Sequence, residues 1–281
     1  MVRKRQISLT SLKERLEQVY KGYNRKDLVD PDPLYFLYGY EDPTDREVVG
    51  LVAAGLAYGR VGMIMKTVAR VLETLGPKPA QWLASHSREQ IFNAFPGFFY
   101  RFTRQEHLSA LLQGIKGVHS RYGTMEACLI QGMDPGDPSL MSGLSHLYRE
   151  LDPDNGTGHL LADPTKGSAC KRIHLFLRWM VRRDAVDPGG WDRVSPAGLT
   201  IPLDTHMFRI GTFLRFTTMK SPGRSAALDI TAGFRKICPE DPVKYDFALT
   251  RFGIRRNLEM ADLENCLTLK HAELPHETPR L

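Results

Sequence analysis

Two side chains in this sequence could together carry out amine chemistry: Lys171 and Asp204. Lys171 falls in the first turn of a predicted helix over 169–183, where the partial positive charge of a helix N-terminus makes a lysine unusual. From that dipole and the neighbouring Arg172 we expect a lysine suited to nucleophilic attack. A lysine that binds phosphate or is simply solvated is the alternative interpretation of the same pattern.

Asp204 stands in the segment IPLDTHMFRIG (201–211), where a proline ends an extended approach and apolar residues resume at helical spacing. Aspartate in such a position is among the commonest N-cap residues, and capping alone explains it. A capping role and a catalytic role can coexist in one carboxylate. The sequence therefore predicts an N-cap at Asp204 and leaves the second role open.

Positive charge is concentrated around these two residues. The 281-residue chain has a formal charge of +6, and residues 165–225 hold eleven Lys or Arg against four acids, a net of +7. A focused basic face attracts nucleic acid through phosphate contacts and counterion release, although many basic runs are only solvated surface. Hydrophobic residues at 42% and charged residues at 25% are ordinary for a globular protein and argue against the disordered and membrane classes.

The elements that would position the pair are helices. Apolar residues recur at helical spacing over the ranges 9–22, 61–75, 104–119, 138–150 and 169–183. A further buried helix follows a cap at Thr44 or Asp45. The segment 152–168 is rich in Gly, Asp and Pro and predicts a long loop. We therefore predict an all-α fold.

Two segments around the pair carry a family resemblance. IPLDTHMFRIG resembles the V-D-T-H-hydrophobic-x-R segment of helix-hairpin-helix DNA glycosylases, and GSACKRIHLF (167–176) is similar to the start of the second helix of their hairpin. The 33 positions from Lys171 to Asp204 are similar to the archaeal 8-oxoguanine glycosylase branch. Of the hairpin pattern L-P-G-x-G-x-K, Gly167 and Lys171 are present, with Ala169 in place of the second glycine.

The whole chain also resembles an uncharacterised bacterial family of unknown function. The blocks that carry this likeness are YFLYGYEDPTDREVVGLVAAGLAYGRV and KRIHLFLRWMVRRDAVD. This second resemblance implies no activity.

The glycosylase resemblance implies a role for each matching residue. Lys171 would attack the anomeric carbon, and Asp204 would face the reacting sugar. DNA would be bound by a set of residues around them: Gly167, Ser168, Arg172, His206 and Arg209. The implied activity is a DNA repair glycosylase with associated AP lyase activity, which excises an oxidised purine, most readily 8-oxoguanine, through a lysine Schiff base.

The same resemblance implies a bilobal fold with the active site between two helical lobes. The single unit of 1–281 would comprise a central lobe over 45–165 and a terminal lobe from 1–44 plus 166–281. The expected partner is double-stranded DNA containing a damaged base, bound by a monomer.

A base pocket is predicted more weakly. A target base must leave the duplex stack before its sugar can be reached, so stacking surface is required. Tyr58 and Arg60 end the central helix, Phe99 lies in the aromatic stretch FPGFFYRF (95–102), and Trp191 stands between the two catalytic candidates. For each aromatic, core packing is the alternative interpretation.

No metal or cofactor is expected, because the four cysteines lie far apart without a C-x-x-C pair and the histidines follow no ligand spacing. The basic N-terminus lacks the apolar core of a secretion signal, and no stretch approaches the roughly 18 apolar residues of a membrane span. We expect a cytoplasmic, nucleoid-associated protein that does not bind membranes.

Two other functions remain open at the level of sequence. One is a nucleic-acid-binding protein without catalysis, which would use Lys171, Arg172, Arg178 and Arg182 for phosphates. The other is an α-helical interaction module whose basic surface meets an acidic protein. Salt-dependent binding without a product favours the first, and failure to bind DNA at low salt favours the second.

Overall fold

The structure is a computed structural model that describes residues 8–137, 139–255 and 257–268. Helices dominate these residues, which confirms the predicted all-α class. The α-helices are α1 (Leu9–Tyr23), α2 (Pro43–Gly55), α3 (Val61–Leu75), α4 (Pro79–Ser85), α5 (Arg88–Asn93), α6 (Gln105–Tyr122), α7 (Met125–Gln131), α8 (Met141–Leu151), α9 (Lys171–Val181), α10 (Thr205–Phe213), α11 (Arg224–Arg235), α12 (Asp246–Ile254) and α13 (Met260–Thr268). Shorter elements are the 3-10 helices η1 (Lys26–Leu28), η2 (Pro33–Gly39) and η3 (Pro196–Gly198) and the antiparallel strands β1 (Phe99–Tyr100) and β2 (Thr103–Arg104).

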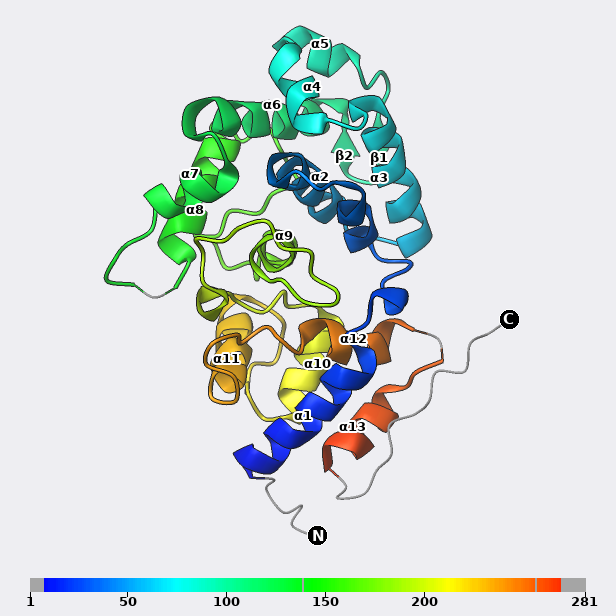
Figure 1. Cartoon of the computed structure of the whole chain (residues 1–281), viewed down its shortest axis with the longest axis vertical. Coiled ribbons are helices and arrows are strands. Elements are labelled where there is room, and N and C mark those ends of the chain that lie inside the picture. The colour runs from blue at the N-terminus through cyan, green and yellow to red at the C-terminus, as the bar shows by residue number, and fades with distance from the viewer. Residues whose placement is uncertain (1–7, 138, 256, 269–281) are drawn as a thin grey trace.

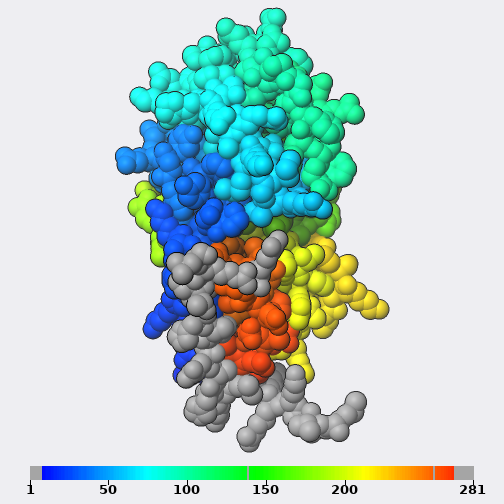
Figure 2. Space-filling model, turned by 90° about the vertical axis from the view of Figure 1, so that its right-hand side faces the viewer, coloured from blue at the N-terminus to red at the C-terminus, as the bar shows by residue number. Residues whose placement is uncertain are grey.

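The helices form an upper and a lower group with α9 between them (Figure 1). The upper group contains α2 to α8, and the lower group contains α1 and α10 to α13. The two ends of the described chain meet in the lower group, where α1 packs against α12 and α13. In Figure 2 the blue of α1 and the red of α13 accordingly share the lower half of the molecule. Residues 1–7 and 269–281, which the prediction assigned to a terminal lobe, lie outside the described residues.

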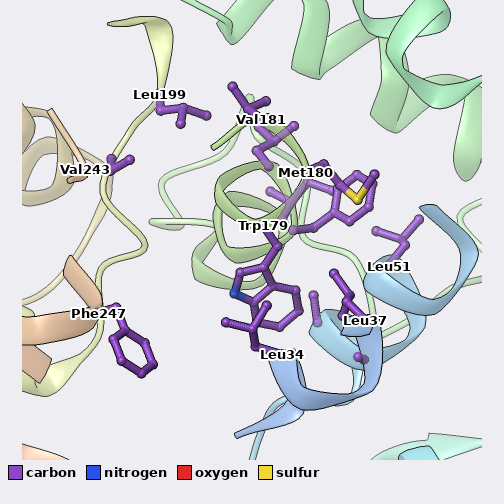
Figure 3. Close-up of a cluster of buried hydrophobic side chains, with 14 of the residues drawn as sticks. Leu34, Leu37, Leu51, Trp179, Met180, Val181, Leu199, Val243 and Phe247 are labelled. Atoms are coloured by element: carbon purple, nitrogen blue, oxygen red, sulfur yellow. The ribbon is translucent and has the colours of Figure 1, made fainter. Parts of the chain in front are cut away.

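Helix α9 forms the centre of the core. It packs on α2, where a Cβ atom at Gly50 would stand only 3.2 Å from the ring of Phe176. Trp179, a second large side chain of α9, is 1% exposed. Its ring lies beside Leu34 and Leu37 of η2 (Figure 3). Full burial of a large apolar side chain stabilises a fold by roughly 1.5–3 kcal/mol, so α9 is firmly fixed.

A buried carboxylate joins the upper helices to the loop after α9. Glu47 of α2 is 1% exposed and accepts hydrogen bonds from the Trp191 indole (2.6 Å) and from the backbone N–H groups of Met125 (2.8 Å) and Glu126 (3.1 Å). Its Oε2 also lies 2.9 Å from Nε2 of His119. A buried charge is tolerated only when it is paired and hydrogen-bonded, and Glu47 meets that condition with four partners from three segments.

Helix α2 begins earlier than its expected cap. The N-cap is Asp42, whose carboxylate accepts a hydrogen bond from the Thr44 N–H (2.7 Å). Pro43 takes the first helical position, where a missing N–H costs nothing. The predicted cap at Thr44 or Asp45 is therefore wrong by two or three positions. Asp45 instead accepts a hydrogen bond from the backbone N–H of Ala80 (2.8 Å) at the start of α4.

The C-terminal end of α9 is held by a buried ion network. Arg178 pairs with Asp187 (3.1 Å) and with Asp246 of α12. Arg182 pairs with Asp187 and with Asp241 (2.9 Å). The two guanidinium groups are 3% and 4% exposed and Asp187 is fully buried, so this end of the helix is sealed from solvent.

Candidate active site

The N-terminal end of α9 carries Lys171 as its first residue. Cys170 before it adopts the left-handed conformation (φ 46°), and its N–H donates to Oγ of Ser168 (3.1 Å). Nζ of Lys171 lies 3.3 Å from Oδ2 of Asp204. The structure thus brings together the two residues from which the sequence predicts amine chemistry.

Asp204 is the N-cap of α10, as predicted. Its Oδ1 accepts a hydrogen bond from the backbone N–H of Met207 (2.8 Å). Capping therefore uses one carboxylate oxygen, while the other faces Lys171. The Asp204 side chain is 16% exposed and that of Lys171 is 37% exposed, so both groups can be reached from solvent.

The pair lies in a surface cleft of about 490 Å³. The cleft is lined by Ser168, Ala169, Cys170, Lys171, Leu203, Asp204, Thr205, His206 and Pro222. A second hollow of about 340 Å³ adjoins it, beside Gly167 and Gly223, and the N–H of Arg224 donates to the Gly167 carbonyl between the two loops (3.1 Å). The first residues of α9 and α10 and the loop before α11 therefore meet here. Helix N-termini carry partial positive charge, so this region favours anions such as phosphate.

A buried carboxyl group lies within electrostatic reach of the pair. Burial raises the pKa of Asp246, the first residue of α12, to about 6; Arg178 opposes this shift and the charge of Asp204 adds to it. Oδ1 of Asp246 has no hydrogen-bond partner, while its Oδ2 contacts Arg178. Asp204 thus contacts a cation in the cleft and also acts electrostatically on an acid in the core.

The predicted DNA-binding residues are divided by the structure. Gly167 and Ser168 are exposed at the cleft and its neighbouring hollow, and His206 lines the cleft. Arg172 does not present its charge there: it donates to the Gly55 carbonyl (3.0 Å), and its guanidinium lies 5.2 Å from the centre of the Tyr58 ring.

Arg209 also lies away from the cleft residues. It is 59% exposed and pairs with Glu264 of α13 at 3.2 Å, because five residues along α10 turn it from the side that Asp204 occupies. The hypothesis of nucleic-acid binding without catalysis also assigned Arg178 and Arg182 to phosphates, but both are buried and paired with carboxylates. Of the four cations in that hypothesis, only Lys171 is accessible at the cleft.

None of the predicted base-pocket residues lines the cleft. Trp191 is 3% exposed, bonded to Glu47 and packed edge-on against Phe176, so it plugs the core and the expectation of a base contact is corrected. Tyr58 and Arg60 follow α2, and Phe99 lies on β1, 63% exposed.

The loop before α11 was missed by the sequence reasoning. Pro222 lines the cleft, and Arg224 and Ser225 line the adjoining hollow. The available signal was the turn tripeptide Ser-Pro-Gly ahead of a helical stretch, which marks a helix start without indicating which site the loop approaches.

Within the described ranges, no three or more His, Cys, Asp or Glu side chains are grouped as metal ligands would be. Nor does any described helix combine the length and apolar character needed to cross a membrane.

The chain belongs to a family whose model is described as Protein of unknown function (DUF2400) and matches residues 32–255. No curated protein and no solved structure matches the chain.

The expected membership of the helix-hairpin-helix DNA glycosylases is therefore wrong. The matching family model is that of DUF2400, and no model of the glycosylase family matches. The local structure agrees with this correction, since residues 152–170, all of them described, contain no helix to form the first arm of a hairpin before α9. Ala169 and the left-handed Cys170 precede α9 where the hairpin turn would lie. The likeness of GSACKRIHLF to the glycosylase hairpin is therefore limited to the start of its second helix.

Proposed function

We propose that Lys171 and Asp204 are the catalytic pair of a DNA repair enzyme that removes an oxidised purine and cleaves the strand through a lysine Schiff base. The observation that carries this proposal is the 3.3 Å contact between amine and carboxylate inside an open cleft. The contact and the charge around it support amine chemistry on a phosphate-bearing substrate, and the oxidised purine is the substrate expected from the sequence segments around the pair.

The first chemical step is base displacement. Asp204 accepts a proton from the Lys171 ammonium group, and the free amine attacks C1′ of the deoxyribose. The bond from C1′ to the purine nitrogen breaks, its electron pair leaves with the base, and the base takes up the proton. Once its proton has passed to the leaving base, Asp204 is again a carboxylate and stabilises the positive charge left on the amine adduct.

Strand cleavage follows from the covalent intermediate. The C1′–O4′ bond opens, O4′ takes a proton, and an iminium forms between Lys171 and C1′. Loss of a proton from C2′ then expels the 3′-phosphate by β-elimination. Water hydrolyses the iminium and restores the lysine. An abasic site enters the same route as its open-chain aldehyde, losing one water molecule on condensation with the amine.

The surroundings of the pair suit a DNA substrate. A cleft of about 490 Å³ falls within the range of ligand sites, and helix N-termini at its edge favour phosphate oxygens. Lys166 beside the adjoining hollow is 76% exposed and adds positive charge. All the residues that line the cleft fall within 166–281, so the pair lies in the predicted terminal lobe and not between that lobe and 45–165. The proposed protein is a nucleoid-associated monomer that binds damaged double-stranded DNA.

Borohydride trapping tests this function. The protein is incubated with duplexes containing 8-oxoguanine, uracil, an alkylated purine or an abasic site, and borohydride reduces any iminium to a stable adduct. Wild type should form an adduct with the 8-oxoguanine and abasic duplexes, and Lys171→Gln should form none. Lys21→Gln is the matched control, since it removes an exposed lysine of α1, a helix that contributes no residue to the cleft, and it should trap as wild type does.

Three results would overturn the proposal. Wild type that traps no duplex but binds DNA in a salt-dependent way indicates nucleic-acid binding without catalysis. Wild type that binds no DNA at low salt indicates a helical protein-interaction module. Equal trapping by Lys171→Gln and wild type shows that another amine reacts.

A further inference from the structure

The hairpin of β1 and β2 presents an aromatic side chain on a strained turn. Tyr100 pairs with Thr103, which leaves Arg101 and Phe102 as the turn residues. Arg101 has a φ of 54°, although glycine is the usual residue at a first turn position with positive φ. Phe102 beside it is 62% exposed. A strained backbone under an exposed aromatic is a reason to look for a function at this tip.

The base of the hairpin is rigid. The Tyr58 hydroxyl donates to the Tyr100 carbonyl (2.9 Å) and lies 2.6 Å from Oγ1 of Thr103. Tyr100 is 5% exposed, Thr103 is fully buried, and the Tyr100 hydroxyl donates to the Tyr58 carbonyl. These contacts fix the two strands, so Phe102 is held out from the surface with little freedom left to lose on binding.

One arginine and one histidine lie beside this aromatic tip. The Arg101 guanidinium lies 5.6 Å from the centre of the Phe102 ring, and the centre of the His159 ring lies 5.5 Å from it. His159 also touches Tyr58, with ring centres 4.8 Å apart. Burial lowers the pKa of His159, and the charges of Arg172 and Arg101 lower it further, so its charged neighbours are positive.

The hairpin is joined to the proposed catalytic helix by Arg172. This residue follows Lys171 on α9, and its side chain reaches across to the Gly55 carbonyl and the face of the Tyr58 ring. The base of the hairpin and the start of α9 are therefore parts of one packed unit. Figure 1 shows the hairpin beside α2 and α3, in the group of helices above α9.

We infer that the tip of this hairpin, Arg101 and Phe102, is a DNA contact in which Phe102 stacks on a nucleobase and Arg101 binds the adjacent phosphate. The inference rests on the proposed function for its partner, double-stranded DNA with a damaged or missing base. Exposed aromatics flanked by arginines suit nucleic acid, because every base offers a π-face and every nucleotide a negative charge. The gap at a missing base gives Phe102 a position to fill.

Binding to an unreactive duplex tests the tip apart from the chemistry. The probe is a duplex with a tetrahydrofuran abasic analogue, which has no aldehyde, and with 2-aminopurine at the neighbouring base. Wild type should quench 2-aminopurine by stacking. Phe102→Ala should weaken the Kd about tenfold and abolish the change in fluorescence, whereas Phe102→Trp should retain both.

Two controls separate the possible failures. Tyr35→Ala removes another exposed aromatic, 53% exposed on η2, and should leave the Kd unchanged. Circular dichroism should show equal thermal unfolding for Phe102→Ala and wild type, since the side chain is exposed. If Phe102→Ala binds and quenches as wild type does, or if wild type does not bind the probe at low salt, the inference is wrong. Absence of borohydride trapping together with Phe102-dependent binding refutes the catalytic proposal and leaves the DNA contact standing.

Discussion

The two ends of α9 hold positively charged side chains against carboxylates in opposite ways. At the C-terminal end, Arg178 and Arg182 are almost fully buried, and each contacts at least two aspartates. At the N-terminal end, Lys171 is 37% exposed and contacts Asp204 alone among the described carboxylates. The difference shows which pair is available for chemistry. Buried charges that each have several partners maintain the fold, whereas an accessible lysine with one partner can leave that partner and react.

Energetics sharpen this contrast. Removing one member of a buried ion pair strands the other charge in a medium of low dielectric constant, which costs about 3–5 kcal/mol. An exposed pair contributes about 0–1 kcal/mol, because water screens it and two side chains must be ordered. We therefore expect substitutions at one end of α9 to affect stability and substitutions at the other end to affect reactivity.

The largest expected effect is loss of stability on Arg178→Met. This change leaves Asp187 without one of its cations and Asp246 without its only ionic partner among the described residues, so the free energy of unfolding should fall by about 3–5 kcal/mol. Urea denaturation followed by circular dichroism measures it. Arg183→Met is the matched control: its pair with Asp192 is 66% and 80% exposed, and the loss there should be below about 1 kcal/mol. Equal losses for the two variants would contradict the comparison.

The next effect is a dependence of stability on pH from His174, one turn after Lys171. Burial lowers its pKa from 6.5 to about 4, so the unfolded chain binds protons more readily than the folded chain. The contribution of neutral His174 to the free energy of unfolding is complete above pH 6.5 and is lost as the pH falls toward 4. The free energy of unfolding falls by about 3 kcal/mol over this range. Urea midpoints between pH 7 and pH 4 measure it.

His174→Leu serves as the control for that pH dependence. Nδ1 of His174 is buried without a partner, so an apolar side chain of similar size should be tolerated at neutral pH. The variant should lose less stability than wild type between pH 6.5 and 4. If stability falls with pH as steeply in His174→Leu as in wild type, the acid sensitivity belongs to other groups, such as the carboxylates around Arg182.

A smaller effect is expected at the open end from Asp204→Asn. Asparagine caps a helix as well as aspartate does, so stability should stay within about 0.5 kcal/mol of wild type. An amide cannot take the proton from Lys171, and trapping of the abasic duplex should slow about a hundredfold, equivalent to about 2.7 kcal/mol. Asp204→Ala should show the same slowing together with a capping loss of about 1 kcal/mol. Single-turnover trapping rates that equal those of wild type would exclude proton transfer by Asp204.

The sequence predicts local features of this site better than distant ones. The position of Lys171 in the first turn of α9 and the cap at Asp204 follow from spacing and capping preferences within a few residues, and both are present, although α9 begins two residues later than predicted. Trp191 and Arg172 were assigned to DNA because their real partners lie far along the chain. The Trp191 indole bonds Glu47 across 144 positions, and Arg172 bonds the Gly55 carbonyl across 117. No local pattern encodes such pairings, and the same holds for the approach of Pro222 to the cleft.

The smallest expected effect decides whether the two ends of α9 truly differ. Lys171→Met removes the cation of the open pair, and the free energy of unfolding should change by less than about 1 kcal/mol, because Asp204 keeps its capping bond to Met207 and contact with solvent. The same urea denaturation measures it, with Arg178→Met as the opposite extreme. A loss of about 3 kcal/mol or more would show that Lys171 is held as firmly as Arg178. Its contact with Asp204 would then be one more structural ion pair, and the amine would not be free to attack a sugar.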